Sequence, residues 1–168
     1  VWIDGTKPGS PRCTNSDSAQ EFGPNDSRGN PGGRNGILIY KAKGVIVENL
    51  SVCNFLNGDS GGGNQIWWDG GASSGTQSSL GVWWGNYLTA TSSYYKDANT
   101  ASAGYGIYSS NTKAPGYGVF AHDYASNMND SAYYVGACPD CQITLDDVHG
   151  ENAPQGYSGT NSGGHVVV

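Results

Sequence analysis

From about residue 36 to its end, the chain consists of short runs in which apolar and polar residues alternate, separated by Gly, Asn, Ser or Asp. Alternation with a period of two is typical of a strand that buries one face. One register aligns four apolar residues at the same position of successive segments: Leu50, Leu88, Tyr124 and Val148. The residues five positions earlier are then apolar too: Val45, Trp83, Val119 and Ile143. A further strand is predicted before each of the four segments: Ile37–Tyr40, Gln65–Trp68, Gly106–Tyr108 and Tyr133–Val135. A fifth strand of this kind, Gly156–Ser158, begins a fifth cycle.

The spacing of the aligned positions distinguishes between all-β architectures. The four positions are 38, 36 and 24 residues apart. Hairpin sandwiches repeat about every 8–12 residues, and helical repeats need a 3.6-residue period that this chain lacks. Coils that stack on one another, each covering the core of its neighbour, fit the longer spacing. The pattern therefore predicts an all-β parallel β-helix (solenoid) of about four to five coils.

One segment has the character of a known repeat. Gly44–Phe55, with alternating apolar residues and Asn at its bends, resembles the right-handed parallel β-helix repeat family, the pectin-lyase-like superfamily. The resemblance extends over about residues 36–168, and the whole chain looks most like uncharacterised secreted bacterial β-helix proteins. It implies right-handed coils and a polysaccharide as the class of substrate. The family's calcium-binding Asp triplet and its catalytic Arg motif are not recognisable in this chain.

The ends of the chain differ from its middle. Residues 5–35 are polar and rich in Pro, Gly and Asn, which predicts a long loop excursion from a single domain spanning residues 1–168. The chain ends within the apolar run Val166–Val168, with no polar cap. Such an end is expected where a longer β-helix has been cut, or where further coils or a second molecule cover it. The latter would give end-to-end self-association.

The four cysteines indicate an oxidising compartment. An even number of cysteines in a chain rich in Ser, Thr, Gly and Tyr is typical of secreted proteins with disulfides. We predict two bonds, Cys13 with Cys53 and Cys138 with Cys141, out of three pairings that four cysteines allow. The segment Cys138–Cys141 also has two alternative interpretations, a redox CxxC motif and half of a zinc site.

Composition and charge exclude two classes of partner. Lys and Arg number 8 against 14 Asp and Glu, so the net charge is −6, which disfavours a surface that neutralises nucleic-acid phosphates. The sequence contains no apolar run of about 18 residues, the length at which a membrane-spanning helix is expected. The prediction is an extracellular protein with no nucleic-acid partner and no membrane span.

Polar residues beside the aligned positions suggest a catalytic or cation site. In the predicted register Asp123 lies next to Asp147, His122 lies next to Asp146, and His149 lies close by. Adjacent carboxylates repel unless one is protonated or a cation lies between them. The candidate acid/base residues are therefore Asp123, Asp147, His122 and His149, and the candidate Ca²⁺ ligands are Asp123, Asp146 and Asp147. The alternative is an ordinary solvated polar face.

Aromatic residues on the predicted strands suggest a sugar-binding surface. Outward-facing Trp and Tyr offer apolar ring faces on which sugars stack. The candidate substrate-binding residues are Trp68, Trp84, Tyr40 and Tyr108, with Lys41 as a candidate partner for an acidic sugar. In the alternative interpretation, loops cover these rings and Lys41 is an ordinary surface cation.

These features lead to two classes of function. The first is a secreted protein that acts on or binds carbohydrate; if it is an enzyme, we expect a polysaccharide lyase or a glycoside hydrolase. The second is a structural or adhesin module that stacks end to end and presents the loops 5–35, 70–80 and 93–103.

Overall fold

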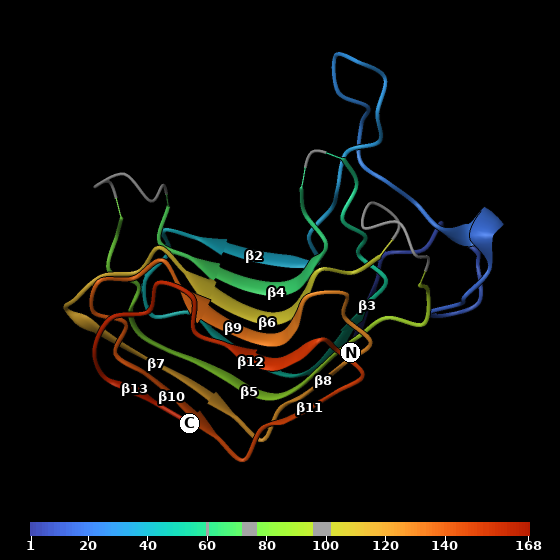
Figure 1. The fold of residues 1–168 in the computed structure, drawn as a ribbon. Helices are drawn as coiled ribbons and strands as arrows, with labels where there is room; N and C mark the ends of the chain where they lie inside the picture. The colour runs from blue at the N-terminus through green and yellow to red at the C-terminus, as the bar shows by residue number, and fades with distance from the viewer. Residues whose placement is uncertain (60, 72–76, 96–101) are drawn as a thin grey trace.

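The computed structural model describes residues 1–59, 61–71, 77–95 and 102–168. These residues form an all-β fold with two parallel sheets (Figure 1). The predicted loops 70–80 and 93–103 lie partly outside the described residues. The eight-stranded sheet consists of β1 (Trp2–Asp4), β3 (Ile46–Cys53), β5 (Gly81–Thr91), β7 (Gly116–Ala121), β8 (Tyr124–Ser126), β10 (Ile143–Asp146), β11 (His149–Glu151) and β13 (Val166–Val167). The five-stranded sheet consists of β2 (Ile37–Tyr40), β4 (Asn64–Asp69), β6 (Tyr105–Ser110), β9 (Ser131–Gly136) and β12 (Gln155–Ser158).

From β2 onward the chain alternates between the two sheets, and each sheet adds its strands in sequence order. The five strands predicted before each segment are confirmed by β2, β4, β6, β9 and β12. Neighbouring strands of this sheet place apolar residues side by side. For example, Ile37 pairs with Ile66, Ile66 pairs with Ile107, and Ile107 pairs with Tyr133. The alternation of apolar residues thus produces columns of stacked side chains between the two sheets.

The centre of the core is aromatic and joins the two sheets. Trp68 of β4 stacks on Trp83 of β5 with ring centroids 5.0 Å apart, and Phe120 of β7 meets both rings. Gly118 pairs with Trp83, and a Cβ atom at Gly118 would lie 2.0 Å from the Trp83 ring. Only glycine at this position leaves room for the indole.

A left-handed residue forms the same corner in successive layers of the eight-stranded sheet. Its φ is 56° at Asn49, 52° at Tyr87, 54° at His122 and 50° at Asp147. Asn and Asp enter this conformation most readily among residues that carry a Cβ. Tyr87 adopts it too, although an aromatic residue seldom has a positive φ.

The predicted register is correct between the first two layers and wrong in the third. Leu50 pairs with Leu88, but Tyr124 pairs with Thr89, and Val119 pairs with Trp84 instead of Trp83. In the displaced layer Asp123 turns inward, and its Oδ1 accepts a hydrogen bond of 2.8 Å from the Leu88 backbone N–H. A one-residue slip moves every side chain to the opposite face, so the surface clusters predicted from that register change with it.

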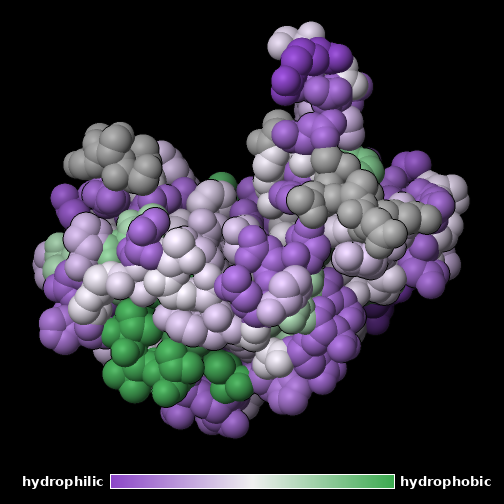
Figure 2. All heavy atoms as spheres, viewed as in Figure 1, coloured by the Kyte–Doolittle hydropathy of each residue, from purple (hydrophilic) through white to green (hydrophobic). Residues whose placement is uncertain are grey.

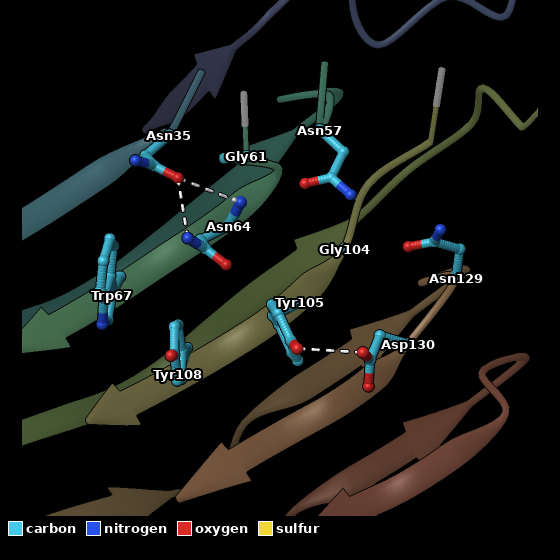
Figure 3. A pocket seen from close by; sticks show the side chains of 11 residues that line it. Asn35, Asn57, Gly61, Asn64, Trp67, Gly104, Tyr105, Tyr108, Asn129 and Asp130 are labelled. Carbon is cyan, nitrogen blue, oxygen red and sulfur yellow. Dashed lines mark hydrogen bonds between the residues drawn. The ribbon is translucent and has the colours of Figure 1, made fainter. Parts of the chain in front are cut away.

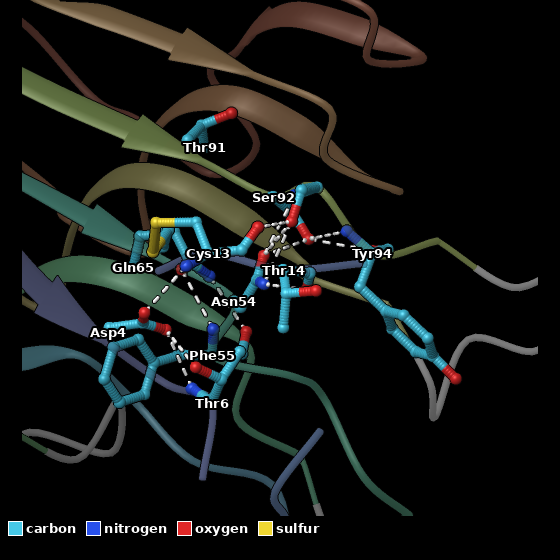
Figure 4. The surroundings of a disulfide bond; sticks show 12 residues. Asp4, Thr6, Cys13, Thr14, Asn54, Phe55, Gln65, Thr91, Ser92 and Tyr94 are labelled. Carbon is cyan, nitrogen blue, oxygen red and sulfur yellow. Dashed lines mark hydrogen bonds between the residues drawn. A yellow bond between two sulfur atoms is a disulfide. The ribbon is translucent and has the colours of Figure 1, made fainter. Parts of the chain in front are cut away.

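The polar excursion, residues 5–35, is linked to the sheets by a disulfide and by hydrogen bonds. β1 pairs with β3, and the predicted disulfides Cys13–Cys53 and Cys138–Cys141 are both confirmed. Asp4 Oδ2 accepts from the Cys13 N–H at 2.7 Å, and Asn54 Nδ2 donates to the Thr14 carbonyl at 2.9 Å (Figure 4). The polar excursion is therefore held by one covalent bond and by partly buried hydrogen bonds near the end of β3.

Candidate functional site

A cleft of about 580 Å³ opens beside the first residues of strands β4, β6 and β9 (Figure 3). One of its walls is aromatic, and the opposite side is formed by loops that carry amides and glycines. Its lining residues are Asn35, Asn57, Gly61, Gly62, Asn64, Trp67, Gly104, Tyr105, Tyr108, Asn129 and Asp130. The volume lies within the range of small-molecule binding sites.

The aromatic wall follows from the strand register. Trp67 pairs with Tyr108 across β4 and β6, and their rings stack 5.0 Å apart at an interplanar angle of 12°. Tyr105 stacks on Tyr108 with centroids 4.9 Å apart, and Tyr134 of β9 packs edge-on against Tyr108. Burial raises the pKa of the Tyr108 and Tyr134 phenols. The wall is therefore a rigid group of neutral rings.

The amide side of the cleft holds an acceptor without a donor. Asn64 is 5% exposed, and its Nδ2 donates to Asn35 Oδ1 at 2.9 Å. Its Oδ1 is buried and has no hydrogen-bond partner among the described residues. Leaving such an oxygen unpaired costs about 1–3 kcal/mol. The Asn57 side chain, on the neighbouring loop, also makes no hydrogen bond within the described chain. The Asn64 oxygen therefore lacks a donor, and no hydrogen bond to the rest of the described chain holds the Asn57 amide.

Asp130 is the one formally charged side chain among the described lining residues. Its Oδ2 accepts from the Tyr105 hydroxyl at 2.9 Å, and its Oδ1 accepts from the Ser131 hydroxyl at 2.8 Å. Burial and this hydrogen bond raise the pKa of Tyr105 well above its usual value, so the phenol stays protonated and keeps donating. Each carboxylate oxygen still has an acceptor position for a ligand.

The predicted acid/base and calcium residues are separated by the slip in register. The His122 backbone N–H donates to the Asp146 carbonyl at 3.1 Å, but its side chain meets Asp147: Nδ1 is 2.9 Å from Asp147 Oδ2. Asp123 is buried away from both, whereas Asp146 and Asp147 are exposed. Asp123, Asp146 and Asp147 therefore do not gather around one point. Within the described ranges, the single cluster of three metal-ligating side chains is Asp4, Cys13 and Cys53, and its two sulfurs are bonded to each other.

The histidines lie on the outer corner of the eight-stranded sheet. The His122 ring stacks on Tyr87 at 4.8 Å, and the His149 ring stacks on Tyr124 at 5.5 Å. His149 Nε2 is 3.1 Å from Glu151 Oε2. These exposed pairs do not line the cleft beside β4, β6 and β9.

The predicted aromatic surface is wrong in one member and divided among the rest. Trp68 points inward and is fully buried, because the alternation along β4 places Trp67 outside. Trp84 is exposed on the other sheet, and Tyr40 is exposed on β2 with Lys41 Nζ 5.2 Å from its ring centroid. Of the predicted set, Tyr108 alone lines the cleft.

Little in the sequence pointed to the remaining cleft residues. Asn35 lies two residues before Ile37, and Asn64 lies two residues before Ile66, with which Ile37 pairs. Aligning these two strands in the sequence could therefore have shown that the two asparagines are neighbours. Asn57 and Asp130 come from loops, whose approach to one another depends on the fold. No pattern in the sequence brings them together.

No family model, curated protein or solved structure matches the chain. The function is therefore inferred from the geometry of the cleft. No helix among the described residues is long and apolar enough to cross a bilayer.

Proposed function

We propose that the cleft binds a carbohydrate. The observation that carries the proposal is the meeting of an aromatic wall with the unpaired amide oxygen of Asn64 in one cleft. Sugar rings combine apolar C–H faces with hydroxyl groups, so they match a site that offers both ring surfaces and hydrogen-bonding groups.

The lining favours binding over hydrolysis. Most glycoside hydrolases use two carboxyl groups on opposite sides of the scissile bond. The described lining residues provide one, Asp130, which is hydrogen-bonded to Tyr105. The proposed activity is therefore recognition of a glycan without its hydrolysis.

Asn57→Ala is expected to weaken glycan binding about 2- to 10-fold, the value of one net hydrogen bond. The fold should be retained, because the Asn57 side chain makes no hydrogen bond within the described chain. Titration calorimetry on glycans selected from an array of neutral and acidic oligosaccharides measures the effect. Trp84→Ala, on the other sheet, is the matched control and should bind like the parent. Equal losses in both variants, or no glycan bound by the parent, would refute the proposal.

We further propose that the two sheets belong to a right-handed parallel β-helix of the pectin-lyase-like type and that the protein is secreted. The regular alternation of the chain between two parallel sheets supports the first part. Two disulfides support the second, because such bonds persist in oxidising compartments.

A second candidate function is end-to-end stacking of two copies. β12 and β13 are the last strands of their sheets, and Figure 2 shows an apolar patch where Figure 1 places β13. Val167 on this strand is 59% exposed. An open strand edge with apolar side chains is prone to pair with another edge.

Stacking predicts a molar mass that rises with protein concentration in light scattering. Val167→Asp should shift this association to higher concentration, because a charge would be buried at the contact. Val82→Asp, an exposed position on β5, is the control and should leave it unchanged. A constant monomer mass for the parent would exclude this function.

A further inference from the structure

We infer that the cleft selects a neutral oligosaccharide of at least two sugar units and rejects uronic acids. This inference rests on the proposed function and specifies its ligand. It also departs from the acidic sugars for which Lys41 is a candidate partner, since Lys41 does not line the cleft.

Charge is the first argument. The described lining contains the carboxylate of Asp130 and no cationic side chain. Arg34 precedes the lining residue Asn35 but does not itself line the cleft. Its guanidinium forms an ion pair with Glu21 Oε2 at 2.9 Å. The net charge of the chain, −6, has the same sign as a uronate. A uronate in the cleft would meet a like charge without compensation.

The second argument concerns the donors that the ligand must bring. The buried Asn64 Oδ1 and the open positions on the Asp130 carboxylate are all acceptors. A hydroxyl group can donate to an acceptor of this kind, whereas an ionised carboxylate of a ligand can only accept. A neutral sugar supplies these donors around its whole ring.

The span between the two acceptors sets the minimum size. Asn64 on β4 pairs with Tyr105 on β6, and Tyr105 pairs with Ser131 on β9, directly after Asp130. Two steps between neighbouring strands separate the backbones of Asn64 and Ser131 by about 9–10 Å. A ligand of two sugar units matches this span better than a single ring does. The ligand therefore crosses the strands β4, β6 and β9.

Oligogalacturonides of one length provide the test, because the same chain can be compared as the free acid, the methyl ester and the carboxyl-reduced neutral form. The parent protein is expected to bind both neutral forms at least about tenfold more tightly than the free acid. If this backbone is not bound, any neutral oligosaccharide from the array and its C6-oxidised counterpart replace it. Asp130→Asn should bring the ratio close to one by strengthening binding of the acid, while Trp84→Ala should leave the ratio unchanged. A ladder of mono-, di- and trisaccharides should show the largest gain in affinity at the second unit.

The outcomes separate the two proposals. If no glycan binds, the proposed function fails and this inference fails with it. If glycans bind and Asn57→Ala weakens them, but the free acid binds as well as the neutral form, glycan binding stands and the neutral selectivity is overturned. A monosaccharide that binds as tightly as the disaccharide would overturn the required length.

Discussion

Trp68→Ala is expected to lower the free energy of unfolding by about 3–5 kcal/mol, the usual cost of removing a fully buried aromatic side chain. Trp68 has no exposed surface, and its ring packs on both Trp83 and Phe120 between the two sheets. Its removal leaves a cavity that Gly118, the neighbour of Trp83, cannot fill. Urea denaturation followed by circular dichroism measures the loss.

Trp84→Ala is the matched control because it removes the same side chain from the outside. Trp84 is 39% exposed and follows Trp83 on the same strand. Its loss should cost about 1 kcal/mol or less, as is usual for partly exposed surface positions. Similar losses for the two variants would show that the indoles are not divided between core and surface.

The strands were predictable because the signal is local. β2 begins and ends at the predicted residues, Ile37 and Tyr40, and β4 extends the predicted Gln65–Trp68 by one residue on each side. Alternation over four to six residues, bounded by Gly and Asn, is enough to place a strand. The pairing of the cysteines was also correctly predicted.

The direction of each side chain was less predictable because it depends on register. Trp67 and Trp68 are chemically equivalent in the pattern, and the neighbouring strands decide which one is buried. In the third layer the pattern favours Tyr124 as the apolar residue to align, whereas the structure pairs Tyr124 with Thr89 and buries Asp123. A buried carboxylate is rare enough that hydrophobic pattern alone assigns it to the surface.

Most residues of the cleft could not be predicted from the sequence, because they are far apart along the chain. Tyr108 was identified as outward-facing, but its partners Asn57 and Asp130 lie in loops 51 and 22 residues away along the chain. Loops carry no periodicity, and their meeting depends on how distant strands pair.

Asp123→Asn is expected to remove a strong pH dependence of stability. Asp123 is 2% exposed, and burial raises the pKa of its carboxyl to about 7, although the Leu88 N–H and the nearby His122 oppose the shift. Its Oδ2 is buried without a partner among the described residues. The carboxyl is therefore more stable protonated in the folded protein, whereas in the unfolded chain it ionises near the ordinary aspartate pKa of 3.8.

The direction of the effect follows from proton binding. Between about pH 4 and pH 7 the folded state holds a proton that the unfolded state has released, so the stability of the parent falls as the pH rises, by up to about 1.4 kcal/mol per unit. Below this window both states are protonated, and above it both are ionised. Relative to the parent, Asp123→Asn should therefore gain about 3–4 kcal/mol between pH 4 and pH 8, because an amide does not ionise.

Urea denaturation of both proteins across this pH range measures the difference, and its pH dependence distinguishes ionisation from any fixed effect of the new amide on packing. Asp146→Asn, at an exposed carboxylate on β10, controls for the change in net charge and should follow the parent curve. Parallel curves for the parent and Asp123→Asn would show that Asp123 titrates alike in the folded and unfolded chains. A difference that widens steadily toward pH 7 would instead identify Asp123 as the buried group whose ionisation weakens the fold as the pH rises.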